Sequence, residues 1–148
     1  MLVELSIENL GIIESVRVTF DGGFTAFTGE TGAGKTMLVE AINLVVGRRA
    51  DVSVIRDGAD EARVEARFIT KGPDGEIETI LCRVLHREGR SRAYVNDRMA
   101  TVTSLAEIGD ELVDIHGQHA HQRLLSAATQ RQSLDQFAGV DTSHLRTA

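Results

Sequence analysis

The sequence has a single cysteine, no long apolar run and no excess of positive charge, and each shortage excludes a class of protein. Cys82 stands alone, so no disulfide can form within the chain, and a reducing cytoplasm is the expected location. No apolar run is long enough to span a membrane. Residues 1–4 lack the basic segment of a secretory signal, so we expect neither export nor a membrane partner.

Size and charge narrow the possibilities further. The 148 residues are 42% hydrophobic and 26% charged, which suits one globular domain or most of one. The formal net charge of −6 argues against a protein that binds nucleic acid through its overall field. Lys35 and Lys71 are the only lysines, so arginine supplies nearly all the positive charge.

One stretch carries a specific chemistry. Residues 29–36 match the phosphate-loop pattern G-x-x-x-x-G-K-[ST] at every fixed position. Its glycines let backbone N–H groups approach a polyphosphate, and a helix that begins at once adds its own free N–H groups. Lys35 would reach the β- and γ-phosphates, and the Thr36 hydroxyl would be a ligand of Mg²⁺. The predicted nucleotide-binding residues are Gly29, Glu30, Thr31, Gly32, Ala33, Gly34, Lys35 and Thr36, with the Glu30 carboxylate pointing away from the phosphates.

The surrounding pattern predicts an α/β fold of the P-loop type. Alternating apolar residues predict strands over residues 3–7 and 16–20, and residues 24–28 predict a short strand that leads into the loop. Apolar residues at helical spacing predict a helix over residues 37–46, which Gly47 can end.

The second half of the sequence alternates strands with short helices. Residues 48–60 are polar and predict an exposed loop, and three strands over residues 64–68, 77–86 and 91–95 predict an antiparallel meander with one wet face. Further on, we expect a short helix capped by Ser104 and Glu107, a buried strand over residues 113–116, and a last helix that carries Leu134 and Phe137.

A nucleotide hydrolase of this kind needs a second motif, an apolar strand that ends in Asp or Asp-Glu, to hold the Mg²⁺ shell and polarise the attacking water. The nearest candidate is Asp114, but Ile115 follows it where a second carboxylate would be expected. We therefore expect the chain to be one part of a larger site.

Residues 114–122 leave other interpretations open. Asp114 and Gly117 fit the D-x-x-G motif of small GTPases, although no N-K-x-D signature accompanies them. His116, His119 and His121 could share a metal ion, although no cysteine or acidic spacing completes a familiar site. A polar loop with surface histidines, or a loop that senses a nucleotide, would have the same composition.

Several stretches together resemble a known family. Residues 2–10, the loop 28–36 and the helix 37–46 look like the N-terminal half of an ABC-type ATPase head of the SMC-like class. Residues 47–51 and 113–119 narrow the resemblance to the RecN family of bacterial DNA repair proteins. The resemblance implies an N-terminal head lobe with an antiparallel β-subdomain over residues 1–139, and residues 140–148 as the start of the connection to a coiled coil. It also implies the cofactors ATP and Mg²⁺.

The same resemblance assigns two further residues. Gln118 matches the glutamine that reaches the Mg²⁺ and the attacking water in ABC-type heads, so Lys35 and Gln118 are the predicted catalytic residues. Arg56 matches an arginine that SMC-type heads place near the nucleotide, although a solvated loop arginine would look the same. The family's signature motif, Asp-Glu strand and switch histidine are not in this sequence, which implies that a C-terminal half supplies them.

The implied partners are that C-terminal half, a second head in an ATP-sandwiched dimer, and DNA contacted through the full protein. The implied function is ATP hydrolysis in double-strand-break repair by a cytoplasmic, nucleoid-associated protein, with this chain inactive alone. The nucleotide-binding subunit of a membrane transporter shares the same lobe and is the main alternative. Such subunits stack adenine on an aromatic residue ahead of the phosphate loop, whereas here we expect Phe20, Phe24 and Phe27 in the core. A third possibility is a module that folds and binds partners without activity of its own.

Overall fold

The computed structural model describes residues 1–29, 34–113, 115, 131 and 134. The chain divides into two compact units, Met1–Val113 and Asp114–Ala148, and the elements below all belong to the first. In the second unit, Arg131 and Leu134 have a helical backbone, as the predicted last helix requires. None of the helices in the described ranges is long and apolar enough to cross a membrane.

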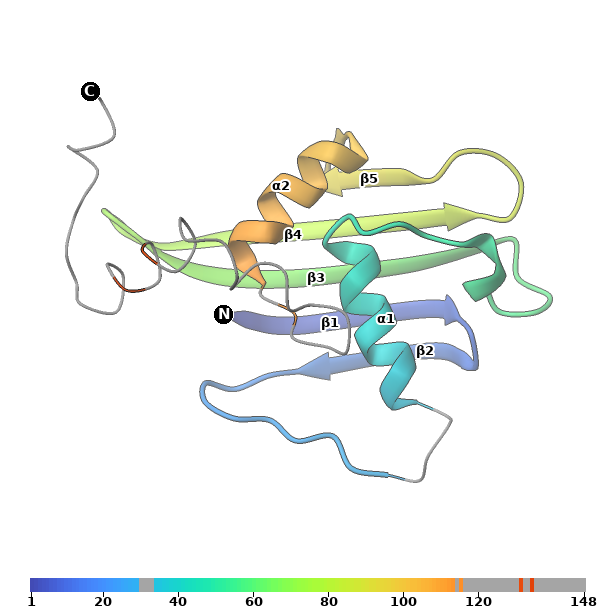
Figure 1. The fold of residues 1–148 in the computed structure, drawn as a ribbon, viewed down its shortest axis with the longest axis horizontal. Helices are drawn as coiled ribbons and strands as arrows, with labels where there is room; N and C mark the ends of the chain where they lie inside the picture. The colour runs from blue at the N-terminus through green and yellow to red at the C-terminus, as the bar shows by residue number, and fades with distance from the viewer. Residues whose placement is uncertain (30–33, 114, 116–130, 132–133, 135–148) are drawn as a thin grey trace. The chain divides into compact units, whose positions relative to one another are not determined.

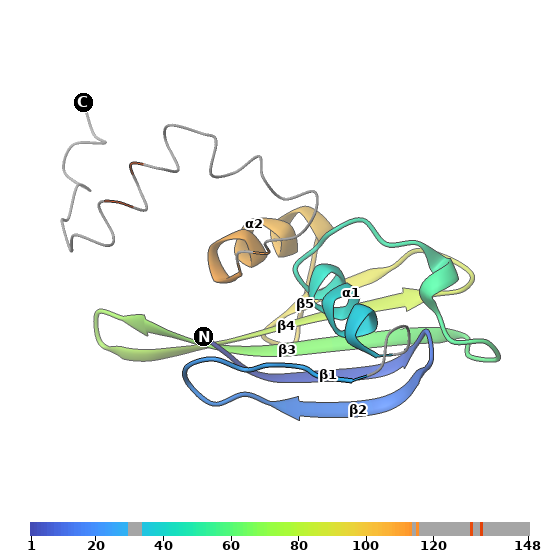
Figure 2. The same cartoon turned by 60° about the horizontal axis from the view of Figure 1, so that its bottom comes forward.

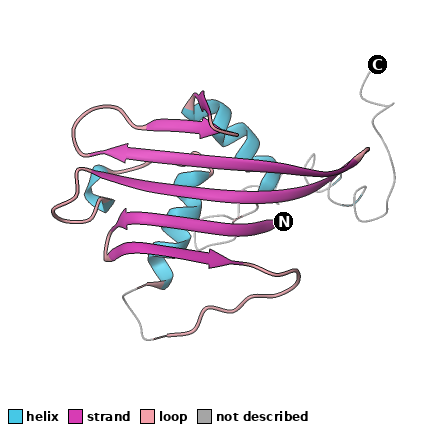
Figure 3. Cartoon of the chain, turned by 180° about the vertical axis from the view of Figure 1, so that it is seen from behind, coloured by secondary structure: helices cyan, strands magenta, loops and turns pink. Residues whose placement is uncertain are grey.

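The first unit is built on an antiparallel sheet of six strands in the order β2-β1-β3-β4-β5-β6 (Figures 1 and 3). Its strands are β1 (Leu2–Leu10), β2 (Ile13–Thr19), β3 (Glu61–Gly72), β4 (Gly75–His86), β5 (Arg92–Val95) and β6 (Arg98–Ala100). Period-two alternation explains the neighbouring strands β1 and β3, in which buried apolar residues alternate with polar ones. The predicted meander is confirmed, and the short edge strand β6 was not predicted.

Two helices, α1 (Lys35–Val45) and α2 (Val102–Leu112), cover one face of this sheet, and neither of them lies on the other face (Figures 2 and 3). α1 packs on β1, β3 and β4, and α2 packs on β5. The predicted helix that follows the phosphate loop is therefore confirmed. It ends at Val45, two residues before Gly47, whose φ of +79° suits glycine.

The hydrophobic core lies between α1 and the sheet. Leu5, Ile7, Phe68 and Leu44 are fully buried, and each side chain of this size contributes roughly 1.5–3 kcal/mol when buried. Cys82 is also buried, as predicted, although it lies on the sheet face opposite α1 and α2. Burial raises the pKa of its thiol to about 11, because the charged thiolate is poorly solvated there.

The predicted strand over residues 24–28 is wrong. These residues have no strand conformation, and the side chain of Phe24 is 94% exposed. Phe27 is 45% exposed and contacts Phe20 edge to face, with ring centroids 6.1 Å apart. Within the described part of the chain, no strand pairs with this segment, because the sheet ends at β2 on that side. Placing Phe24 and Phe27 in the core was therefore also wrong.

The predicted exposed loop over residues 48–60 is only partly right. It contains a 3₁₀ turn, η1 (Val52–Val54), and Ile55 is 2% exposed and forms a β-bridge with Leu10. The predicted cap at Ser104 is also displaced. Thr101 caps α2, because its hydroxyl accepts a hydrogen bond from the Ser104 N–H at 3.0 Å. Two of the four residues in the predicted strand over residues 113–116 lie outside the described residues, and the other two, Val113 and Ile115, are not in a strand.

The turn between β1 and β2 contacts the first turn of α1. Gly11 has a φ of +54°, and a Cβ there would lie 2.5 Å from the Met37 sulfur. The Gly11 N–H also donates to the Val54 carbonyl at 2.7 Å. The positive φ favours glycine here, and a side chain would also have to displace the flexible end of Met37.

The buried thiol gives a pH-dependent stability. Because the folded state raises the Cys82 pKa, it holds a proton that the unfolded chain releases above about pH 8.5. This contribution to stability is therefore lost as the pH rises toward 11, by on the order of 1 kcal/mol between pH 8 and pH 10. Urea unfolding at the two pH values should show the loss in the natural chain and a smaller one in Cys82→Ala. An equal loss of unfolding free energy between the two pH values in both proteins would contradict the assignment of this pH dependence to Cys82.

The close approach at Gly11 is testable by a matched pair of glycine substitutions. Gly58 has a similar φ of +83°, but a Cβ there meets nothing within 4 Å among the described atoms. Gly58→Ala should therefore cost only the backbone strain, about 1 kcal/mol, and Gly11→Ala should cost about 0.5–1.5 kcal/mol more, because the end of the Met37 side chain must move to another rotamer. Adding Met37→Ala to Gly11→Ala should recover part of that excess. Equal losses at the two glycines, measured by denaturant unfolding, would show that the Gly11–Met37 contact is absent.

Candidate functional site

The candidate site is the N-terminus of α1, where the predicted phosphate loop meets its helix. Gly34 is the N-cap residue, and Lys35 and Thr36 lie in the first turn. No side chain caps this end, and the first turn has no acidic residue. The free N–H groups and the positive end of the helix dipole are thus left for an external anion.

The backbone on both sides of the loop suits a bulky anion. A Cβ placed on Gly29 or on Gly34 would have no described atom within 4 Å, so the backbone there borders open space. The Lys35 ammonium donates a hydrogen bond back to the Gly29 carbonyl. That bond folds the lysine over the loop, where its charge adds to that of the helix N-terminus. The residues present therefore fit a polyphosphate, and the exposed Thr36 hydroxyl is suited to a hard cation such as Mg²⁺.

Several predicted site residues fall outside the described residues. They are Glu30, Thr31, Gly32, Ala33 and Gln118, together with Asp114 and the histidines of residues 116–121. The small-GTPase and metal interpretations of that segment remain predictions. Within the described ranges, no group of three or more His, Cys, Asp or Glu residues is placed to hold a metal ion.

Arg56, the other predicted nucleotide contact, is held against the turn between β1 and β2. Its Nη1 donates to the Ile12 carbonyl at 2.8 Å, and its Nη2 lies 3.8 Å from the Glu14 carboxylate. Its backbone N–H donates to the Asn9 carbonyl at 2.9 Å. The same turn contacts α1 through Gly11, so Arg56 supports an element that borders the candidate site.

A second arginine, which no sequence pattern predicts, also binds the loop that carries Arg56. Arg87 follows β4, and its guanidinium donates to the carbonyls of Ala59 and Arg56, each at 2.9 Å. Arg87 occurs in a charged turn that predicts only solvent exposure. A single arginine that binds loop carbonyls leaves no periodic signal in a sequence.

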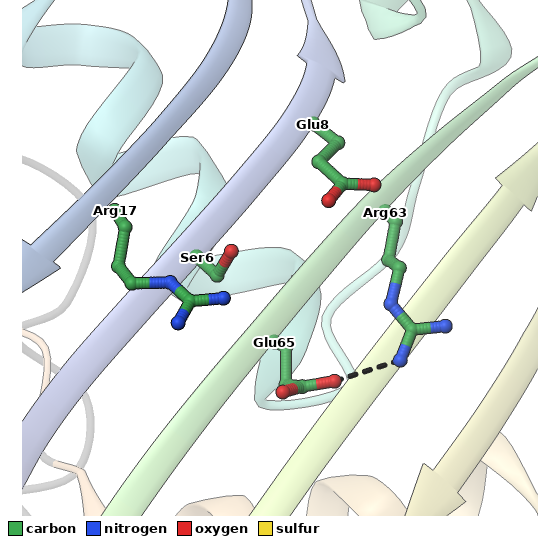
Figure 4. A pocket seen from close by; sticks show the side chains of 5 residues that line it. All are labelled: Ser6, Glu8, Arg17, Arg63 and Glu65. Carbon is green, nitrogen blue, oxygen red and sulfur yellow. Dashed lines mark hydrogen bonds and ion pairs between the residues drawn. The ribbon is translucent and has the colours of Figure 1, made fainter.

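A second concave region lies on the opposite face of the sheet (Figure 4). It is a shallow depression of about 190 Å³ lined by Ser6, Glu8, Arg17, Arg63 and Glu65. Ser6 and Glu8 alternate along β1 with buried Leu5 and Ile7, and Arg17, Glu65 and Arg63 lie opposite them on β2 and β3, so this set points away from α1. Arg63 and Glu65 form an ion pair at 2.7 Å, and the charges in the depression balance. It is therefore separate from the anion site at α1.

Comparisons with known proteins agree with this geometry. Residues 4–143 match the family described as AAA domain. The chain is 38% identical to the DNA repair protein RecN of Vibrio cholerae over 151 residues, which cover 94% of this chain and 27% of that protein. It is 41% identical to RecN of Bacillus subtilis, with coverage of 99% and 28%. The chain thus spans about a quarter of the length of these relatives.

Solved structures show the same fold. The Smc head domain with a coiled coil and joint from Pyrococcus yayanosii superposes with a TM-score of 0.68 at 24% identity, covering 93% of this chain and 32% of that one. An Smc head bound to the C-winged helix domain of ScpA gives a TM-score of 0.63 at 27% identity, covering 72% and 39%. The recombination mediator RecF with ATP gives 0.66 at 19% identity, covering 90% and 36%.

The resemblance inferred from the sequence is therefore confirmed. The chain belongs to the AAA domain family, its fold is that of the N-terminal lobe of an SMC-type P-loop ATPase head, and its relatives in sequence are RecN proteins.

Proposed function

We propose that this chain is the ATP-binding lobe of an SMC-like ATPase that acts in DNA double-strand-break repair. The observation that carries the proposal is the N-terminus of α1, which is uncapped, free of acidic residues and equipped with Lys35 and Thr36. ATP is favoured among phosphates because RecF, a structural neighbour, binds ATP. DNA repair is favoured because the relatives at 37–43% identity are named DNA repair protein RecN.

In this proposal the residues of the phosphate loop, Gln118 and Arg56 have different roles in nucleotide binding and hydrolysis. Backbone N–H groups of residues 29–34 and of the first turn of α1 hold the phosphates, and Lys35 neutralises charge that develops on them. Thr36 and Gln118 are ligands of Mg²⁺, and Gln118 also orients the attacking water. Arg56 approaches the nucleotide from the turn between β1 and β2. The bound Mg²⁺ supplies further charge stabilisation for phosphoryl transfer.

The site needs a partner to become active. No apolar stretch typical of a strand ends in Asp-Glu in the sequence, so we assign the water-polarising acid to the C-terminal half of the same head. The exposed Phe24 and Phe27 support this assignment, because an unpaired segment with two exposed aromatic side chains is suited to being covered. We propose that the lobe ends near residue 139, that a second head completes each ATP site, and that the full protein contacts DNA.

The two alternative functions, a transporter subunit and a small GTPase, have less support. A transporter subunit would call for relatives among transporters, whereas the matches reported above are RecN proteins, Smc heads and RecF. A small GTPase has only the two-residue D-x-x-G match in its favour. One solved structure that superposes with a TM-score of 0.66 is described under ATP-driven dimerisation and DNA-stimulated activation of SMC ATPases. We infer a similar nucleotide cycle here.

Lys35→Ala should abolish ATP binding by an assembled head, defined as this chain together with its C-terminal half. Loss of a charged donor to the phosphates should lower the affinity by at least about 100-fold, roughly 2.7 kcal/mol. Lys71→Ala is the matched control, because Lys71 is the only other lysine and is exposed at the far end of β3. Equilibrium binding of a fluorescent ATP analogue measures both, and undiminished affinity in Lys35→Ala would refute the assignment.

Gln118→Ala should leave ATP affinity within about threefold and lower the turnover number by about 10²-fold, the usual size of a lost water-positioning group. Gln122→Ala, in the same segment, is the control and should have the natural rate. Steady-state hydrolysis by the assembled head gives both constants, and a natural rate in Gln118→Ala would remove that residue from the active site.

A further inference from the structure

The C-terminal end of α1 is interlocked with α2 at two glycines. A Cβ on Gly109, in the middle of α2, would lie 2.6 Å from the Val46 Cβ and 2.9 Å from the Val46 carbonyl oxygen. A Cβ on Gly47 would lie 2.6 Å from the Ala106 nitrogen. Real Cβ atoms do not approach this closely, so the two backbones pack directly against each other. We call this contact, Val46–Arg48 against Ala106–Asp110, the glycine junction.

The glycine junction is rigidly attached to α1. The Arg48 N–H donates to the Asn43 carbonyl at 2.9 Å, and the Gly47 N–H donates to the Leu44 carbonyl at 3.1 Å. These two bonds, with Gly47 at a φ of +79°, form a Schellman motif. Residues 46–48 therefore move with the helix that precedes them. Any displacement of the junction is carried along α1, whose 11 residues span about 16 Å, to Lys35.

α2 is in turn fixed to the rest of the lobe. Leu105 is fully buried, and α2 packs on β5. An ion pair at 3.1 Å joins Arg48 to Asp110 beside Gly109. The C-terminus of α2 lies at Leu112, and Gln118 follows six residues later in the sequence. α2 is thus joined by packing to the helix that carries Lys35 and by the chain to Gln118.

We propose that the glycine junction is a positioning element of the nucleotide site, and that Gly47 and Gly109 are positioning residues for Lys35 and Thr36. This inference depends on the function proposed above. Phosphates bound at the N-terminus of α1 are sensed at α2 through the junction, because backbone atoms of Val46 and Ala106 pack directly on the two glycines and such close packing transmits strain. Glycine is required at position 109 for this contact alone, since alanine is the better helix former by about 1 kcal/mol.

Gly109→Ala is therefore the informative variant. It inserts a methyl group between the helices without weakening α2 itself, and should lower the ATP affinity of the assembled head by about 3- to 10-fold. Gly72→Ala is the matched control. It also crowds a neighbour, the Ile77 side chain, but at the β3–β4 hairpin and away from both helices. Thermal unfolding of both variants identifies any loss that comes from stability alone.

Amide hydrogen exchange with and without Mg·ATP reads the coupling directly. In the natural head we expect ATP to slow exchange in the first turns of α1 and also in α2, by at least about threefold in each. In Gly109→Ala the slowing in α2 should be lost, and in Gly72→Ala it should persist. Slower exchange in α1 with no change in α2, or natural coupling and affinity in Gly109→Ala, would overturn the inference and leave the proposed function intact. No ATP effect on either helix would instead refute the proposed function, and the inference with it.

Discussion

The structure depends on the packing of α1 on the antiparallel sheet. The loop before this helix has no strand to pair with in the described part of the chain, so burial of Ala41, Leu44 and Val45 against the sheet is what fixes the helix. The β1–β2 turn packs on its first turn through Gly11 and Met37, and α2 packs on its last through Gly109. The N-terminus of α1 is thereby held in a defined place while its N–H groups remain free for an anion.

In the function proposed above, a lobe organised in this way binds the nucleotide and needs a partner for catalysis. The charges needed to hold phosphates lie in the first turn of one helix, which the core positions. The segment ahead of the loop is exposed, with Phe24 at 94%. The sequence also has no convincing copy of the Asp-Glu motif that would supply an acid to polarise water. Both gaps have the same physical explanation if a second half of the head pairs with this segment and brings the acid.

Local sequence patterns predicted the strands and the helix that each bury one face in the core. β1, β3 and α1 follow clear periods of 2 and 3.6, and the phosphate loop has fixed spacing, so these could be placed from the sequence. Features that depend on distant neighbours could not. The apolar residues 24–28 look like a strand, yet pairing decides whether a strand forms. Arg83 occurs in an apolar strand and is only 4% exposed, with a single hydrogen bond, to Ser91 at 2.9 Å, among the described contacts. Hydrophobic periodicity predicts neither the burial of Arg83 nor the backbone contacts at Gly47 and Gly109.

We propose that this chain is half of a split ATPase site, and a comparison of the chain alone with the assembled head tests this. Binding and hydrolysis of ATP and GTP in the presence of Mg²⁺ would be measured before and after the C-terminal half is added. Adenine-selective hydrolysis that appears only on mixing is the predicted result. Turnover by this chain alone, or a preference for GTP, would contradict the account and point to Asp114 as an acid already present in the site.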